Sequence, residues 1–279
     1  MKTIVVIGAG NIGGSLIAGI LKSGIADREH VIACETAAER AEQIRQQYGI
    51  RVIERDARTV VPEADAIIVA VKPQTVPHVL KEIREVLRAD QVLISVAAAV
   101  PIRLIEKVVG RQVPVFRAMP NIPVMVDEGA TGLAWNNHAS PEQRAFVESI
   151  FRSVGVVCAV NEELMDAVTG LSGSGPAYIY MVIEALIAGG LKVGLPHDIA
   201  TRLAEQTVLG AAKLVRETML HPAILKDRVI TPGGVTIAAI HELERHGLRA
   251  MLISAVETAT RRSQQLTQSL MEKFDCPEQ

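Results

Sequence analysis

The amino-acid sequence predicts an α/β domain with a doubly wound, mainly parallel sheet, followed by an all-α domain. Short apolar runs alternate with helical patterns through residues 1–160. A glycine-rich turn directly follows the first apolar run, as expected for a ligand-binding strand–turn–helix unit. Beyond Asn161 the strand-like runs stop and the remaining patterns are helical. We therefore expect two domains, residues 1–160 and residues 161–279.

The first domain is expected to alternate strand and helix. The predicted strands are residues 3–7, 31–34, 66–71, 92–96 and 113–117, with 131–135 and 154–160 completing the sheet. The predicted helices are residues 11–23, 37–48, 76–87 and 102–108, with one more after Ser140-Pro141. Such alternation places helices on both faces of a parallel sheet.

The second domain is expected to consist of helices only. They are predicted at residues 162–171, 177–193, 198–217, 235–246 and 248–272. The run Ser172-Gly173-Ser174-Gly175-Pro176 is expected to be a turn between two helices or the border of a binding pocket. Residues 177–194 and 200–215 are apolar on more than one face. This is more apolar surface than a small helical domain can hide, so the domain is predicted to mediate dimerisation.

Composition excludes several classes of protein. A hydrophobic content of 49% and a charged content of 22% are typical of a packed globular protein. A formal charge of −2 and 3% aromatic residues argue against nucleic-acid binding. Residues 3–21 carry no charge, but five glycines and Asn11 interrupt them. They are therefore interpreted as a strand, a turn and a helix, and not as a signal peptide or a membrane span.

Cysteine and histidine usage points to a cytoplasmic protein without a metal centre. Cys34, Cys158 and Cys276 are far apart and lack the spacing of metal ligands. Reduced thiols in the cytoplasm account for them best. The seven histidines are scattered, so no metal site is expected.

The sequence Gly8-Ala9-Gly10-Asn11-Ile12-Gly13 follows the first strand and opens a helix. In such a turn Gly8 permits the sharp reversal, Gly10 lets a pyrophosphate approach, and Gly13 lets the helix pack on the strand. Glu35 follows Gly13 by 22 residues at the end of the second strand, where a carboxylate accepts hydrogen bonds from an adenosine ribose. This pattern predicts a Rossmann dinucleotide-binding domain, although Glu35 would also fit a plain surface acid.

Three further strand ends are candidates for the same site. Lys72, in Val71-Lys72-Pro73, would lie near the cofactor or simply be a solvated lysine. Ala97, Ala98 and Ala99 follow the next strand, where small side chains leave room for a nicotinamide. Asn121 follows another strand end and would contact the cofactor or cap a turn.

A second motif lies near the C-terminus. Thr231-Pro232-Gly233-Gly234-Val235-Thr236-Ile237 places two glycines between two threonines at the start of an amphipathic helix. Unpaired amides at a helix start, together with the two hydroxyls, form a cradle for a carboxylate. A capped helix start without a ligand is the alternative. A hydride donor combined with a carboxylate cradle suggests a reductase of a small acid.

These motifs together resemble those of pyrroline-5-carboxylate reductases over almost the whole chain. The resemblance rests on the glycine turn, Ala70-Val71-Lys72-Pro73, Met119-Pro120-Asn121, residues 166–178, Leu225-Lys226-Asp227 and residues 231–236. It implies transfer of a hydride from NAD(P)H to the cyclic imine of 1-pyrroline-5-carboxylate, giving L-proline. It also implies a homodimer, or a larger ring such as a decamer, in which each active site takes its cofactor from one chain and its cradle from the other.

The motifs and the resemblance together assign the residues of both sites. The residues expected to bind the dinucleotide are Ile7, Gly8, Ala9, Gly10, Asn11, Ile12, Gly13, Glu35, Ala70, Val71, Lys72, Pro73, Val96, Ala97, Ala98 and Asn121. The residues expected to bind the substrate are Glu162, Thr231, Gly233, Gly234, Val235 and Thr236. Thr236 is expected to be catalytic, with its hydroxyl facing the ring nitrogen, because a hydroxyl can both donate and accept a hydrogen bond.

The chain departs from the family pattern at four places. Ala99 replaces a usual glycine, Met219 and Leu220 stand where a glutamate is common, and Arg228 replaces a usual asparagine. Glu35 stands where NADPH-using relatives have a small or basic residue. A carboxylate there suits a free ribose hydroxyl and predicts a preference for NADH. Arg40 lies about one helical turn away, and a contact between its side chain and a 2′-phosphate would weaken this preference.

Two other functions fit parts of the sequence. A β-hydroxyacid dehydrogenase also joins a Rossmann domain to helices, but its catalytic lysine would follow the glycine-rich helix start closely. Here Gly173-Ser174-Gly175 is followed by Pro176-Ala177-Tyr178, and the next lysine is Lys192. The other alternative is a non-catalytic, nucleotide-sensing scaffold, against which the intact cradle at residues 231–236 argues.

Overall fold

The computed structural model describes residues 1–275, which form two compact units. The first unit comprises Met1–Ser174 together with the described residues from Glu257 onward, and the second comprises Gly175–Val256. The predicted fold class, a doubly wound sheet followed by helices, is confirmed. The domain boundary predicted between residues 160 and 161 stays a prediction.

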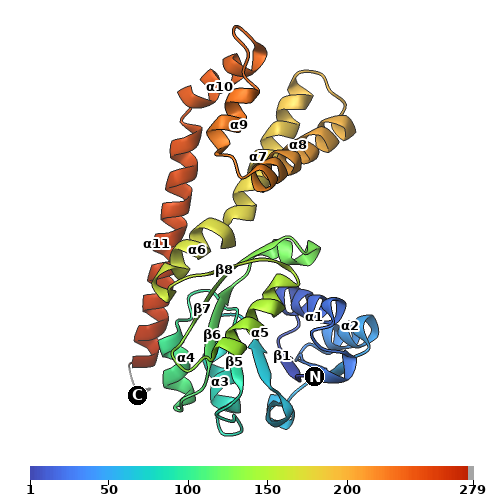
Figure 1. Ribbon diagram of the computed structural model, residues 1–279, viewed down its shortest axis with the longest axis vertical. Coiled ribbons are helices and arrows are strands. Elements are labelled where there is room, and N and C mark those ends of the chain that lie inside the picture. Colours follow the sequence, from blue (N-terminus) through green and yellow to red (C-terminus); the bar gives the residue numbers. More distant parts are fainter. Residues whose placement is uncertain (276–279) are drawn as a thin grey trace. The chain divides into compact units, whose positions relative to one another are not determined.

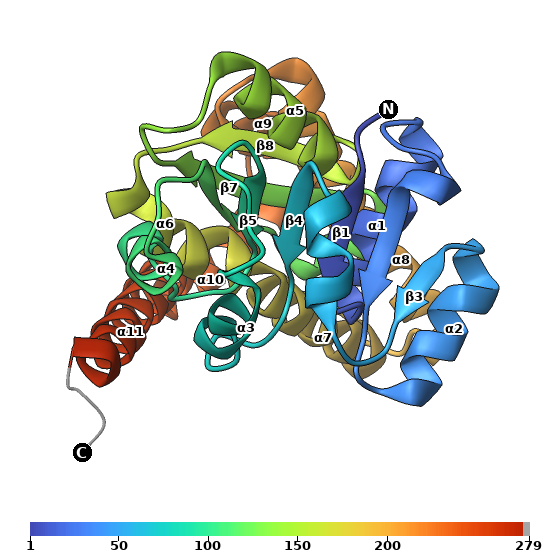
Figure 2. The same cartoon turned by 90° about the horizontal axis from the view of Figure 1, so that it is seen from below.

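The first unit is built on an eight-stranded sheet in the order β3-β2-β1-β4-β5-β6-β7-β8. All neighbouring strands are parallel except β6 and β7, which are antiparallel. Strands β5, β4 and β1 lie side by side in Figure 2. The strands are β1 (Ile4–Ile7), β2 (Val31–Cys34), β3 (Arg51–Ile53), β4 (Ala66–Val69), β5 (Val92–Ser95), β6 (Val115–Met119), β7 (Gly129–Trp135) and β8 (Gly155–Ala159).

Helices cover both faces of this sheet because its central strands are apolar on both sides. All four residues of β1 are buried, and alternate residues belong to two separate cores. One core includes side chains of α3 and α4, and the other includes side chains of α1 and α5. The helices of this unit are α1 (Asn11–Ser23), α2 (Ala38–Tyr48), α3 (Val76–Ile83), α4 (Ile102–Val109), α5 (Pro141–Arg152), α6 (Met165–Val168) and the part of α11 (Leu248–Asp275) from Glu257 onward.

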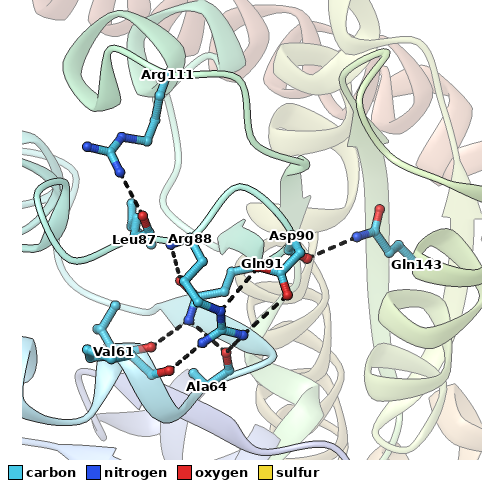
Figure 3. A network of polar contacts seen from close by, with 9 residues as sticks. Val61, Ala64, Leu87, Arg88, Asp90, Gln91, Arg111 and Gln143 are labelled. Atoms are coloured by element: carbon cyan, nitrogen blue, oxygen red, sulfur yellow. Dashed lines mark hydrogen bonds and ion pairs between the residues drawn. The ribbon is translucent and has the colours of Figure 1, made fainter.

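A polar network joins the segments that precede β4 and β5 (Figure 3). The Gln91 amide, 1% exposed, donates to the carbonyls of Val61 (2.6 Å) and Ala64 (2.7 Å). The Arg88 guanidinium donates to Ala64 (3.1 Å) and pairs with Asp90 (3.1 Å). These segments lie at the amino ends of the strands. The network therefore fixes the edge of the sheet opposite the one where parallel α/β folds bind ligands.

The second unit consists of helices, and α7 and α8 lie side by side in it (Figure 1). Within Gly175–Val256 the buried residues are Ala200 and Ala204, so this unit has almost no core of its own. Large apolar side chains such as Met181, Leu203 and Leu209 are more than half exposed. The helices are α7 (Gly175–Lys192), α8 (His197–Thr218), α9 (Pro222–Arg228), α10 (Val235–Arg245) and the first part of α11 (Leu248–Asp275).

One helical run among residues 1–275 is long and apolar enough, by length and composition, to cross a membrane. It extends over Glu162–Lys192, and none of its most apolar window is buried. The uncharged N-terminal stretch is different, because it forms the buried strand β1 and helix α1, as predicted.

The structure corrects three local predictions. The predicted helix at residues 162–171 is a 3₁₀ turn, then α6, then a π-helical turn at Thr169–Gly173. The predicted helix-to-helix turn at residues 172–176 is shorter than expected: the π turn extends to Gly173, Ser174 is a bend, and α7 begins at Gly175 with Pro176 in its first turn. No helix was predicted at residues 222–228, but α9 lies there, and the His221 ring caps it by accepting a hydrogen bond from the Ala223 amide (3.2 Å).

Met219 caps the C-terminal end of α8, and we expect one substitution of it to stabilise the protein. Its φ is +55° and its side chain is 86% exposed, so the residue adopts a left-handed conformation without burying apolar surface. We expect Met219→Gly to raise the free energy of unfolding by about 1 kcal/mol, since glycine has no Cβ to clash there. Met219→Ala keeps the Cβ and serves as the matched control. Equal melting temperatures for the two variants would contradict this explanation.

Candidate active site

The main cleft of the first unit lies at the carboxyl ends of β1, β2 and β4. Ile7, Cys34 and Val69 end these strands in register. A cavity of about 490 Å³ opens there, beside the point where the strand order reverses between β1 and β4. Open α/β sheets bind their ligands at such a switch point. The predicted residues that line this cavity are Ile7, Gly8, Gly10, Glu35, Ala70, Val71 and Lys72.

The glycine turn has the geometry that a dinucleotide requires. Gly8 has φ +93°, and a Cβ on it would lie 2.7 Å from the Ala70 carbonyl oxygen. A Cβ on Gly13 would lie 2.0 Å from the Gly8 carbonyl oxygen, so helix and turn are in close contact. A Cβ on Gly10 would meet no atom within 4 Å. Close packing of the backbone therefore requires glycine at positions 8 and 13, whereas Gly10 leaves space for a ligand.

The start of α1 offers amides to that ligand. Its first backbone hydrogen bond runs from the Gly14 amide to the Gly10 carbonyl (2.8 Å), and no side chain caps the helix. The amides before Gly14 thus lack an intrahelical acceptor. The helix dipole adds a partial positive charge at the same end. The turn therefore fits the pyrophosphate of a dinucleotide.

Glu35 lies at the edge of the cleft, as its place after β2 predicts. Its two carboxylate oxygens accept hydrogen bonds from the amides of Ala9 (2.9 Å) and Ala37 (3.0 Å). The side chain is only half-buried and lines the cavity. A negative charge is thus held at the end of the cleft beside β2.

The structure adds residues that the sequence did not assign to the cleft. They are Thr36, Ile53, Glu54, Arg55, Ala57, Thr75, His78, Val79 and Glu82, with Cys34 beneath them. Several of these follow β3, a strand with no clear pattern in the sequence, so no signal identified them. Burial raises the pKa of the Cys34 thiol to about 12, and the sulfur is therefore protonated and unreactive. Cys34 and Cys158 are free thiols, while Cys276 lies outside the described residues.

Other predicted cofactor residues do not line this cavity. They are Ala9, Asn11, Ile12, Gly13, Pro73, Val96, Ala97, Ala98 and Asn121. The Asn121 side chain is hydrogen-bonded through both its nitrogen and its oxygen: it donates to the Ser172 carbonyl (2.9 Å) and accepts from the Ala130 amide (2.8 Å). Ala99, after β5, is 4% exposed and has φ +61°, the conformation for which a glycine would be usual. Cofactor contacts by these nine residues, and by the seven that line the cavity, remain predictions.

Glu162 belongs to an ionic cluster around the buried Arg117 in the first unit. Its carboxylate accepts from the Ile102 amide at the start of α4 (2.6 Å) and lies 3.4 Å from Arg117, which is 4% exposed. Asp166 lies 3.7 Å from Arg117 and accepts from the hydroxyl of Ser263 in α11 (2.6 Å). Glu162 also lines a separate hollow of about 410 Å³. Its predicted contact with substrate remains a prediction.

The predicted carboxylate cradle lies in the second unit, at the start of α10. Gly233 has φ +68°, and the Gly234 amide donates to the Thr231 carbonyl (3.0 Å), closing the turn. Gly234 caps the helix without any side-chain hydrogen bond, and Val235 is 88% exposed. The first amides of α10 are therefore left for a ligand. Thr236 is the second helical residue and is not the cap.

Two family models match most of the chain. A family model for pyrroline-5-carboxylate reductase dimerisation matches residues 162–266, and a model for NADP oxidoreductases, coenzyme F420-dependent, matches residues 3–99. A pyrroline-5-carboxylate reductase from Methanosarcina acetivorans is 44% identical over 93% of this chain and 96% of its own. The chain belongs to the pyrroline-5-carboxylate reductase family.

Solved structures of family members superpose closely on this chain. A pyrroline-5-carboxylate reductase from Coxiella burnetii has a TM-score of 0.89 and 35% identity, over 95% of this chain and 98% of its own. The enzyme from Plasmodium falciparum, solved with NADP bound, has a TM-score of 0.86 and 28% identity over the same shares. The Rossmann fold and the family resemblance expected from the sequence are thus confirmed.

Proposed function

We propose that this protein reduces 1-pyrroline-5-carboxylate to L-proline with NAD(P)H. The observation that carries the proposal is the open start of α10, where a glycine cap leaves helix amides unpaired between two threonines. Amides and a helix dipole bind a carboxylate well. The glycine turn and the cleft at the carboxyl edge of the sheet supply the matching dinucleotide site in the same chain.

The reaction requires mainly that the protein holds the substrate and the cofactor in the correct relative position. A reduced nicotinamide bound in the cleft would supply a hydride to the imine carbon, and the electron pair of the C=N bond would move to the ring nitrogen. The cradle at residues 231–236 would hold the carboxylate and so orient the ring. The Thr236 hydroxyl would face the ring nitrogen and relay a proton to it, because a hydroxyl can both donate and accept a hydrogen bond. No histidine or lysine is required for these steps.

We propose that the active protein is a homodimer, able to assemble further into a ring such as a decamer. The second unit buries almost no residues and exposes large apolar side chains. In a monomer these side chains would be in contact with water, whereas a partner chain would cover them. The apolar run Glu162–Lys192 falls within residues 162–266, matched by the dimerisation family model, so a partner chain is favoured over a lipid bilayer. A cytoplasmic location suits the free thiols of Cys34 and Cys158. We do not expect the protein to bind nucleic acid.

A turnover assay tests the reaction itself. Purified protein is mixed with 1-pyrroline-5-carboxylate and either NADH or NADPH, and oxidation of the nicotinamide is followed by absorbance. A parallel reaction with a β-hydroxy acid and NAD⁺ or NADP⁺ tests the dehydrogenase alternative. Proline formation with either cofactor supports the proposal. Dinucleotide binding without any turnover would favour a sensing scaffold instead.

We also propose a preference for NADH, carried by Glu35. Its carboxylate lines the cleft and would repel a 2′-phosphate, whereas it can accept from a free ribose hydroxyl. Glu35→Ser is expected to raise the ratio of kcat/KM for NADPH over NADH by at least about tenfold, since like charges in contact cost several kcal/mol and tenfold corresponds to about 1.4 kcal/mol. A wild-type preference for NADPH of tenfold or more would contradict this role of Glu35.

A further inference from the structure

Ala9, in the middle of the glycine turn, is held by two side chains of opposite charge. Its amide donates to the Glu35 carboxylate (2.9 Å), and its carbonyl accepts from Nε of Arg40 (2.8 Å). Its methyl group is fully buried in the core beneath the turn. Side chains that lie 26 and 31 residues further along the chain therefore fix both polar groups of this residue.

Arg40 is not placed to bind a ligand in the adenosine cleft. A second guanidinium nitrogen donates to Gln43 on the same helix (3.2 Å), and another lies so close to Gly14 that a Cβ there would be 3.0 Å away. Glu35 lines the main cavity, whereas Arg40 lines a separate hollow with Gly14 and Tyr48. The guanidinium is thus directed to the backbone of the turn and of α1.

We propose that Arg40 is a positioning residue for the dinucleotide pyrophosphate. By binding the Ala9 carbonyl, the guanidinium neutralises a partial negative charge close to where phosphate oxygens would approach Gly10. It also fixes the peptide plane, so that the open amides of α1 are arranged before the ligand arrives. NADH and NADPH share the pyrophosphate, so Arg40 contributes equally to the binding of both. This inference rests on the proposed dinucleotide site.

The test measures the dissociation constants of NADH and NADPH for the full-length protein by isothermal titration calorimetry. Arg40→Met keeps much of the aliphatic bulk and removes the charge and the donor. We expect it to raise both constants by a similar factor of about tenfold, corresponding to about 1.4 kcal/mol. Arg40→Lys keeps the charge but not the planar donor, and both constants should rise by less. Arg152→Met, on α5, removes only a surface pair with Glu148 (2.6 Å) and should change neither constant.

The possible outcomes separate this inference from its alternatives. A rise for NADPH alone in Arg40→Met would make Arg40 a ligand of the 2′-phosphate and overturn the proposal. A lower melting temperature with unchanged constants would make the residue merely structural and also overturn it. If Arg40→Met does not fold, the Arg40→Lys constants decide, and wild-type values for both would overturn it. Wild-type protein that binds neither nucleotide would instead remove the dinucleotide site itself, and the role of Arg40 with it.

Discussion

Thr236→Ala is expected to lower turnover of pyrroline-5-carboxylate by about two orders of magnitude, the usual size of a proton-handling contribution. Thr236 is the second residue of α10, and Gly234 is its cap. The threonine hydroxyl is therefore not needed to start the helix. Alanine also has a higher helix propensity than threonine. The melting temperature of the variant should not fall, and its affinity for NADH should be that of the wild type.

Two further variants sharpen this experiment. Thr236→Ser keeps the hydroxyl and should retain much of the turnover. Thr207→Ala is the matched control, because Thr207 is an exposed helical threonine whose hydroxyl only donates to the Leu203 carbonyl (2.7 Å). Initial rates at saturating cofactor and melting temperatures are measured for all three variants. Near-wild-type turnover of Thr236→Ala would rule out a catalytic hydroxyl.

The second large effect is expected in the glycine turn, where two alanine substitutions should behave differently. Gly13→Ala would place a Cβ 2.0 Å from the Gly8 carbonyl oxygen, a backbone atom that cannot turn away. The helix must then move off the turn. We expect a loss of stability of about 3 kcal/mol, at the upper end of the usual cost of overpacking, together with loss of dinucleotide binding.

Gly10→Ala is the matched comparison. A Cβ at Gly10 has no atom within 4 Å, and its φ of −66° is allowed for alanine. The melting temperature should therefore be unchanged or slightly higher, since alanine restricts the unfolded chain. The added methyl group would nevertheless stand where the pyrophosphate approaches, so the dissociation constant of NADH should rise at least tenfold. Wild-type affinity in Gly10→Ala would show that the pyrophosphate lies elsewhere.

The sequence determined those features that depend on local periodicity and on small motifs. Helix α1 has the predicted bounds Asn11–Ser23, because its apolar positions and the glycine turn before it are unambiguous. The central strands were predictable because both of their faces are buried, which requires continuous apolar runs. Gly10 and Glu35 were assigned to the cleft from their spacing alone, and both line it.

Tertiary structure alone decided the elements that are short or that depend on distant partners. Strand β3 has three residues, begins with the exposed Arg51 and exists through its pairing with β2. The π turn bonds Ser174 to Thr169 (2.9 Å) beside Gly173, where a Cβ would be 2.7 Å from Met119. Neither element has a periodic signal, because hydrogen bonds and contacts with other parts of the chain stabilise it.

The same distinction applies to the candidate site. Residue types and spacing indicated that Glu35 and the turn belong together, but they suggested that Arg40 would be free to reach a phosphate. The fold instead places its guanidinium on the Ala9 carbonyl (2.8 Å). Local sequence determines which faces of an element are apolar and where its turns fall. Which distant polar groups a charged side chain meets depends on the path of the whole chain, since the energy of such a contact exists only once the elements are packed.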